Sequence, residues 1–73
     1  MGLAVPARVI IKFLSENGFE MLRIKGSHYI YGKNGISVPV PVHKGKDVSR
    51  GTLKSVLDIA GYTVDEFEKW LGR

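Results

Sequence analysis

The dipeptide Asn34-Gly35 constrains this chain more than any other feature, because it separates two runs in which apolar residues alternate with other residues. An Asn-Gly pair in that setting predicts a β-hairpin with a two-residue turn. Such a turn fixes the pairing of the two strands. Lys33 is expected to lie opposite Ile36, and Tyr31 opposite Val38.

This register sorts the side chains of the hairpin onto two faces, since successive residues of a strand point to opposite sides. The predicted core face carries Tyr29, Tyr31, Ile36, Val38, Val40 and Val42. The other face carries His28, Ile30, Ser37, Pro39, Pro41 and His43. Both histidines of the chain are therefore expected on the outer face, with His28 opposite Pro41 and His43 one diagonal step away. The two prolines lack amide donors, which predicts an edge strand.

Helical periodicity is found on both sides of the predicted strands. Apolar residues recur at helical spacing before Gly18 and again before Gly61, and each glycine is expected to end its helix. Thr63 and Glu66 have the spacing of a capping box, which predicts a last short helix. The expected elements are a helix near residues 6–17, strands near 19–25, 28–33 and 36–42, a helix near 50–60, and a short helix from 63 to 71.

The order helix, three antiparallel strands, helix predicts an α+β domain of the kind that binds double-stranded RNA, with a short C-terminal helix added. Both main helices are expected on one face of the sheet. A chain of 73 residues has room for one domain, 1–73, with one modest core. It has no cysteine and no long apolar stretch, which excludes a thiolate metal site and a membrane-spanning helix. A cytoplasmic protein is the expected default.

Positive charge is concentrated in the middle of the chain. Between residues 23 and 54, seven lysines and arginines face a single carboxylate, Asp47, so this segment carries +6 although the whole chain carries only +4. The expected partner of such a segment is a polyanion such as RNA. The alternative is that these side chains are simply a solvated surface. The residues expected to contact RNA are Lys25, Lys44, Lys46, Arg50 and Lys54.

Four short motifs give the chain a more specific resemblance. They are Asn17-Gly18-Phe19, Gly26-Ser27-His28, Pro41-Val42-His43 and Gly51-Thr52-Leu53, the last leading into Leu57 and Gly61. In these residues the chain resembles the HicA family of bacterial and archaeal toxins, over roughly residues 6–62. The Gly-Ser-His motif is the most specific of the four. The resemblance implies a single HicA-like domain that acts as a messenger-RNA interferase, encoded beside an antitoxin, HicB.

The resemblance also implies that RNA cleavage depends on His28. An imidazole is suited to this work, because it can accept or donate a proton near neutral pH while nearby lysines stabilise charge on a phosphate. It could deprotonate a ribose 2′-hydroxyl or protonate the leaving oxygen. No metal or other cofactor is expected, since this region offers few carboxylates and only two histidines. A HicB-like protein is the expected partner, and no membrane is involved.

Several roles stay open at this point. His28 has the alternative of a structural histidine. His43 is a second proton-transfer group, a substrate-binding group or a cap on the strand end, with the structural and binding roles preferred. Ser27 is a further candidate for catalysis or substrate binding, but it is expected to shape the turn rather than attack, because no carboxylate completes a triad. The whole protein has the alternatives of a non-catalytic RNA-binding module and of a basic surface that docks an acidic partner.

Overall fold

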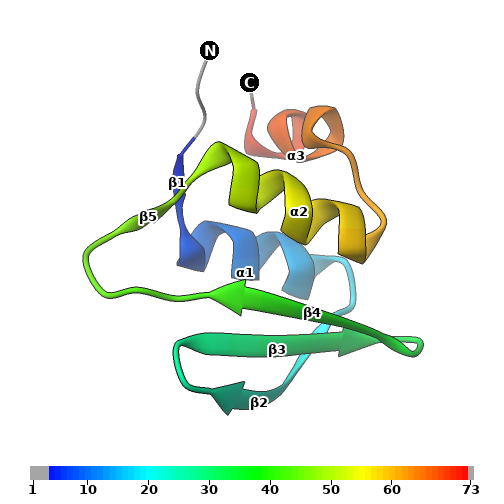
Figure 1. Cartoon of the computed structure of the whole chain (residues 1–73). Coiled ribbons are helices and arrows are strands. Elements are labelled where there is room, and N and C mark those ends of the chain that lie inside the picture. Colours follow the sequence, from blue (N-terminus) through cyan, green and yellow to red (C-terminus); the bar gives the residue numbers. More distant parts are fainter. Residues whose placement is uncertain (1–3, 73) are drawn as a thin grey trace.

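The computed structural model describes residues 4–72 and confirms an α+β domain with a three-stranded antiparallel sheet (Figure 1). Two minor strands that the sequence did not predict pair with each other beside it. In chain order the elements are β1 (Val5–Pro6), α1 (Ala7–Glu16), β2 (Glu20–Lys25), β3 (His28–Lys33), β4 (Ile36–Pro41), β5 (Asp47–Val48), α2 (Arg50–Ala60) and α3 (Val64–Leu71).

The hairpin of β3 and β4 has the predicted register. Tyr31 pairs with Val38 and Lys33 with Ile36. Asn34 and Gly35 both have positive φ, at 49° and 82°. Positive φ at both central residues is what this type of two-residue turn requires, and its twist matches that of the flanking strands. The Asn-Gly pair therefore places every side chain of the hairpin on its face.

The β2–β3 hairpin contains an irregularity that the sequence did not predict. Met21 pairs with Tyr31 while Arg23 pairs with Ile30, so Leu22 is an extra residue in β2. This is a β-bulge, which re-aims the side chains beyond it. The Leu22 side chain lies over Gly32, where an added Cβ would come within 2.5 Å of Leu22 Cδ1. A side chain at position 32 would therefore force the half-exposed Leu22 side chain to move.

The core lies between one face of the sheet and the helices. Figure 1 shows α1 and α2 on the same side of the sheet, as predicted, and both pack on β4. Val38, Val40 and Tyr31 are buried beneath them, so the inner face of the hairpin is assigned correctly there. The buried core residues are Val5, Ala7, Ile10, Phe13, Leu14, Phe19, Tyr31, Val38, Val40, Val48, Leu53, Val56, Leu57, Ala60 and Phe67.

Two hairpin residues differ from the burial that their face predicts. Ile36, expected in the core, is 38% exposed because it lies at the turn. Ile30, expected on the open outer face, is buried. Its direct cross-strand neighbours on that face are Arg23 and Pro39, whose side chains flank it. Alternation along a strand predicts the face correctly, but local neighbours decide the exposure.

The first helix is also slightly shorter than predicted. It spans Ala7–Glu16, and Pro6 before it is extended, with φ −60° and ψ 146°. Pro6 belongs to β1, which pairs with β5 through Val5 opposite Val48 and Pro6 opposite Asp47. This two-residue ribbon joins the start of α1 to the segment that enters α2.

The C-terminal helix packs on α1 through aromatic rings. Phe67 and Trp70 both meet Phe13 edge-on, with ring centroids 5.1 and 5.2 Å apart. The Trp70 indole Nε1 donates a hydrogen bond of 2.9 Å to Glu16 Oε1. Trp70 is therefore a packing residue.

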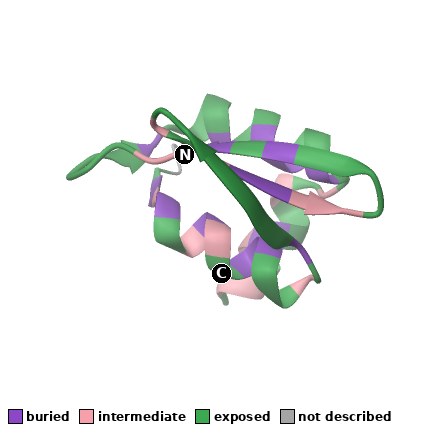
Figure 2. Cartoon of the chain, turned by 90° about the horizontal axis from the view of Figure 1, so that it is seen from below, coloured by how far each residue is buried: buried purple, intermediate pink, exposed green. Residues whose placement is uncertain are grey.

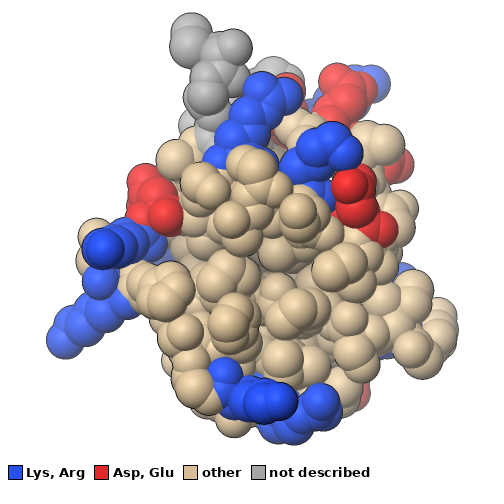
Figure 3. Space-filling model, in the orientation of Figure 1, with Lys and Arg blue, Asp and Glu red and all other residues tan. Residues whose placement is uncertain are grey.

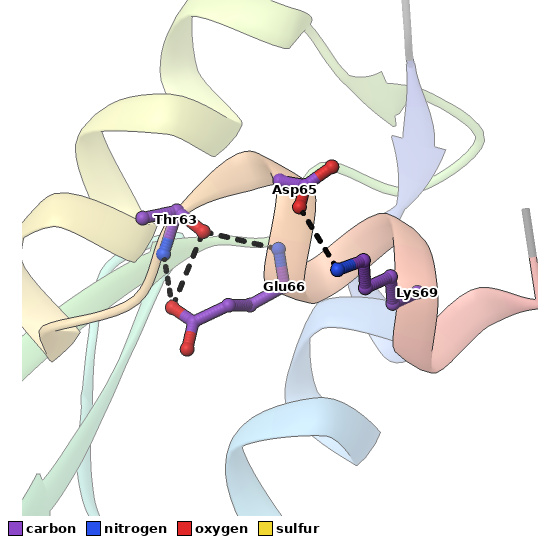
Figure 4. Close-up of polar contacts among 4 residues, drawn as sticks. All are labelled: Thr63, Asp65, Glu66 and Lys69. Carbon is purple, nitrogen blue, oxygen red and sulfur yellow. Dashed lines mark hydrogen bonds and ion pairs between the residues drawn. The ribbon is translucent and has the colours of Figure 1, made fainter.

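The predicted capping box of α3 is present (Figure 4). The Glu66 backbone N–H donates to Thr63 Oγ1 at 3.0 Å, and the Thr63 N–H donates to Glu66 Oε1 at 2.8 Å. The figure also shows an ion pair of 3.5 Å between Lys69 and Asp65, in which both side chains are about three-quarters exposed.

We expect Thr63→Ala to lower the free energy of unfolding by about 1 kcal/mol, because it leaves an amide at the start of α3 without its acceptor. Lys69→Ala, which breaks only the exposed ion pair, should cost at most about 0.5 kcal/mol. Urea denaturation of both variants measures the difference. Equal losses would contradict the importance assigned to the capping box.

Candidate functional site

The two histidines line one open cleft at the end of the sheet where β3 begins and β4 ends. His28 is the first residue of β3 and lies directly opposite Pro41, the last residue of β4. His43 comes two residues after Pro41 along the chain. Both imidazoles are exposed. We call this the histidine cleft, and its lining residues are His28, Pro41, His43, Lys46, Asp47, Val48, Ser49 and Thr52.

The chain segment that follows β4 forms one wall of this cleft. The Val42 N–H donates to the Ser27 carbonyl at 2.7 Å, which holds the end of β4 against the β2–β3 turn. The chain then turns, with the Lys46 N–H donating to the His43 carbonyl at 3.0 Å and with Gly45 at φ 75°. It returns through β5 into α2. The turn therefore brings Lys46 to the same cleft as the two histidines.

The start of α2 forms another wall of the cleft. Ser49 caps the helix, with its Oγ accepting from the Thr52 N–H at 3.4 Å and donating to Thr52 Oγ1 at 3.2 Å. The first turn of a helix carries a partial positive charge and amide donors that no residue within the helix accepts. A phosphate in the cleft would therefore meet the Lys46 ammonium and the amide donors of the first turn of α2 beside the two imidazoles, with the Asp47 carboxylate also in the lining.

His28 also borders a second hollow, on the outer face of the sheet. We call this the outer cleft, and its lining residues are Arg23, Lys25, Gly26, Ser27, His28, Ile30 and Pro39. Lys25 pairs with His28 across the β2–β3 hairpin, so its ammonium group belongs to the same end of the sheet. His28 is thus the residue shared by two adjoining clefts, each with at least one basic side chain.

The remaining basic residues of the predicted set are spread more widely. Lys44 lines a hollow with His43 and Arg8. Lys54 lies one turn into α2 and forms an exposed ion pair of 3.0 Å with Asp58. Arg50 is the first residue of α2. Figure 3 shows basic side chains gathered at the left, where the loop between β4 and β5 projects, and along the bottom by β2, with an uncharged area between them.

The structure adds residues that sequence reasoning did not place at the site. Thr52 lies in the Gly-Thr-Leu motif, but only the cap of α2 shows that its hydroxyl borders the histidine cleft. Asp47 reaches the cleft because β5 pairs with β1. Arg23 reaches the outer cleft because the bulge turns it to the face of Lys25. These placements depend on the bulge in β2 and on the pairing of β1 with β5, and neither feature can be recognised in the amino-acid sequence.

The tyrosines of β3 belong to the core rather than to the clefts. Burial, with a smaller effect from the neighbouring Tyr29, raises the pKa of the Tyr31 hydroxyl above its ordinary range. A hydroxyl with a raised pKa stays protonated near neutral pH and is a poor general base. The proton-transfer candidates at this end of the sheet are therefore the two imidazoles.

Metal chemistry has no evident ligand set here. Among residues 4–72, no three histidine, aspartate or glutamate side chains lie together as a metal site would need. In the same part of the chain, no helix is long and apolar enough to cross a membrane.

The fold and the cleft define a small α+β domain with an exposed histidine pair at one end of its sheet, next to basic side chains. The family model described as the HicA toxin of bacterial toxin-antitoxin systems matches residues 7–62. Since this match covers well over half of the sequence, the chain belongs to the HicA toxin family. The match includes both clefts and ends before α3. No curated protein and no solved structure gives a significant match.

Proposed function

We propose that this member of the HicA family is a metal-independent endoribonuclease that cleaves messenger RNA, with His28 as its catalytic residue. The observation that carries the proposal is the position of His28. Its imidazole is exposed where the histidine cleft and the outer cleft adjoin, so an RNA strand that crosses from one cleft to the other passes over it.

The chemistry needs proton transfer and stabilisation of charge. In the proposed reaction, the ribose 2′-oxygen loses its proton and attacks the adjacent phosphorus. The bond from phosphorus to the 5′-oxygen of the next nucleotide breaks, and that oxygen takes up a proton. The products are a 2′,3′-cyclic phosphate and a free 5′-hydroxyl. His28 serves as the base for the first proton or as the acid for the second.

Other groups of the histidine cleft have supporting roles. Lys46 and the first turn of α2 would stabilise negative charge on the phosphate oxygens. His43 lies close enough to the cleft to hydrogen-bond the substrate or to serve as the second proton-transfer group. We assign it primarily to binding, and we assign Ser27 to shaping the turn that presents His28.

RNA binding is proposed to extend along the basic residues Lys25, Lys44, Lys46, Arg50 and Lys54. Lys46 lines the histidine cleft and Lys25 lines the outer cleft, and His28 lines both, which supports a role of the two lysines in contacting phosphates near the cleaved bond. Lys54 lies farther along α2 and forms an ion pair with Asp58. We therefore expect Lys54 to contribute less than Lys46.

A non-catalytic RNA-binding module of the same fold is the second candidate. In the part of the chain that the structure describes, no hydrogen bond orients either imidazole. A catalytic histidine is commonly held by a second group, although such contacts often tighten only when substrate binds. The absence of such a contact is the observation that supports this second candidate, and cleavage assays separate the two.

We expect His28→Ala to reduce cleavage of a long single-stranded RNA by about 10²–10⁴-fold, the usual contribution of general acid-base catalysis. The wild-type protein should cleave in the presence of a chelator. His43→Ala should lose less activity and mainly affinity. The measurement is the rate of fragment formation for each protein, together with growth inhibition on expression.

The control for this experiment is stability. His28 is exposed, so His28→Ala should change the free energy of unfolding by no more than about 0.5 kcal/mol. Full cleavage by a folded His28→Ala variant would contradict the catalytic assignment. RNA binding without any cleavage by the wild type would favour the non-catalytic module, and loss of cleavage in chelator would indicate a metal.

The basic residues are tested by the salt dependence of RNA affinity. Each phosphate contact removed should flatten the plot of log affinity against log salt by about 0.7–0.9, depending on the form of the RNA. We expect Lys46→Gln to show this change. Lys12→Gln removes the same charge from an exposed position on α1, outside the clefts described above, and serves as the matched control.

The triple variant Lys46→Gln, Arg50→Gln, Lys54→Gln should lose more affinity than Lys46→Gln alone. An unchanged affinity and salt slope in the triple variant would exclude this set as the RNA-binding surface.

The family belongs to toxin-antitoxin systems, and we propose a HicB-like antitoxin as the protein partner. It would inhibit by covering His28 or the rim of the two clefts, with acidic groups placed against the basic residues. Such charge complementarity gives fast association that weakens with salt. Purification from the native source should therefore recover a second, acidic protein at low salt, and recovery of RNA alone would argue against this partner.

A further inference from the structure

The strand β2 is an open edge of the sheet. All six of its residues, Glu20–Lys25, are exposed. Three large apolar side chains in this one strand, Met21, Leu22 and Ile24, are about half exposed, at 49%, 53% and 54%. In Figure 2, which views the molecule from the β2 side, this strand is coloured as exposed along its length. An exposed edge with apolar side chains is a site for pairing with another strand.

The two edges of the sheet differ in their capacity to pair. The sheet order is β2-β3-β4, so β4 is the other edge. Pro39 and Pro41 remove two amide donors from β4, and they are two residues apart, so both donors are missing from the same side of the strand. The strand β2 contains no proline. Its backbone groups are therefore available along the side that faces away from β3.

The bulge at Leu22 determines which side chains share a face. Because Met21 lies opposite Tyr31 and Ile24 opposite Tyr29, both point to the helix side of the sheet. Glu20 and Lys25 lie opposite Gly32 and His28 and point to the outer side. The outer face of the strand thus carries Glu20 at one end and Lys25 at the other, with Leu22 and Arg23 between them, and the helix face carries Met21 and Ile24.

This pattern is complementary to itself when the strand is reversed. In an antiparallel pair of two β2 strands with Glu20 opposite Lys25 of a second copy, Met21 lies opposite Ile24 of that copy. Opposite charges then meet on the outer face, and apolar side chains meet on the helix face, at both ends of the pair. At its centre, Leu22 of each copy lies opposite Arg23 of the other, and no like charges are set directly opposite each other. Neither Glu20 nor Lys25 forms an ion pair within residues 4–72.

Neighbouring registers do not share this match. A slip of one residue in one direction places Arg23 opposite Arg23 of the second copy, which is repulsive. A slip in the other direction places Glu20 opposite Ile24. These two residues point to different faces of the sheet, so this register does not align the faces of the two strands. The bulge and the basic side chains discourage indiscriminate edge pairing. Of the three registers compared, only the one with Glu20 opposite Lys25 makes charges and faces agree.

We propose that β2 is a self-association edge, which pairs antiparallel with β2 of a second copy of this chain in the register that sets Glu20 opposite Lys25. The product is a continuous six-stranded sheet in the order β4-β3-β2-β2-β3-β4. Its two-fold axis is perpendicular to the sheet, so the outer faces of both copies lie on the same side. The outer clefts of the two copies then face the same side of the sheet. The contact is small, so the dimer is expected to be weak and to depend on concentration.

A charge swap tests this register directly. Sedimentation over a range of concentrations up to millimolar should show a monomer-dimer equilibrium for the wild type. Glu20→Lys and Lys25→Glu should each weaken the dimer by about tenfold or more, since each places like charges opposite each other. The double variant restores opposite charges and should recover most of the affinity.

The matched control is Lys12→Glu, which changes the net charge as Lys25→Glu does but lies on α1. A loss of dimer in Lys12→Glu equal to that in Lys25→Glu would contradict the proposal, because net charge would then explain the effect. A wild type that is monomeric at every concentration would also contradict it, as would a dimer that neither single variant weakens.

Hydrogen exchange on the wild type gives a second test that needs no variant. Amides of β2 should become slower to exchange as concentration rises, while the Ser37 amide on the β4 edge should not. If β2 amides are protected only when an antitoxin is added, the edge binds that protein and the self-association proposal is wrong. Because these readouts do not involve cleavage, their outcome is independent of the catalytic role of His28.

Discussion

The two-residue turn at Asn34-Gly35 is the constraint on which the rest of the molecule depends. Both of its residues have positive φ, a conformation that asparagine and glycine adopt at low cost. The turn sets the register of β3 and β4, and the register decides which side chains enter the core. It also places His28 opposite Pro41 on the outer face. A slip of one residue would misalign the core side chains of the two strands and separate the residues of the histidine cleft.

A local contact reinforces this end of the hairpin. The Lys33 ammonium donates a hydrogen bond of 2.6 Å to the carbonyl of Asn17, at the end of α1, and lies 5.7 Å from the centroid of the Phe19 ring. The turn is therefore tied to the helix that covers the sheet. Sequence reasoning included Lys33 in the basic segment, but its charge is used within the fold.

Features that depend on neighbours close in sequence could be predicted from the sequence. The hairpin register, the three helices and the capping box of Thr63 all follow from turn chemistry, periodicity and short spacings. The bulge at Leu22 could not be predicted, because it depends on how that side chain packs over Gly32. The burial of Ile30 was missed for a related reason, since cross-strand neighbours and not the strand's own pattern decide its exposure.

The histidine cleft likewise contains residues whose proximity could be predicted from the sequence and residues whose proximity could not. The sequence places His28 and Pro41 together, because a hairpin register relates them. It does not place Lys46 or Thr52 beside them, because their positions depend on the return of the chain through β5 and on the pairing of Val48 with Val5, more than 40 residues away. Long-range pairings of two residues carry too weak a pattern to be recognised in a sequence.

The two faces of the sheet differ in what covers them. In residues 4–72 the helices pack on one face of the three-stranded sheet, and the core lies there. The outer face then stays open, and its strands can present polar and basic side chains without a cost in packing. Because α1 and α2 pack on β4, the helices also leave β2 beyond their cover. This arrangement of the helices therefore leaves both the histidine end of the sheet and the β2 edge exposed, and these are the two places to which we assign RNA binding and self-association.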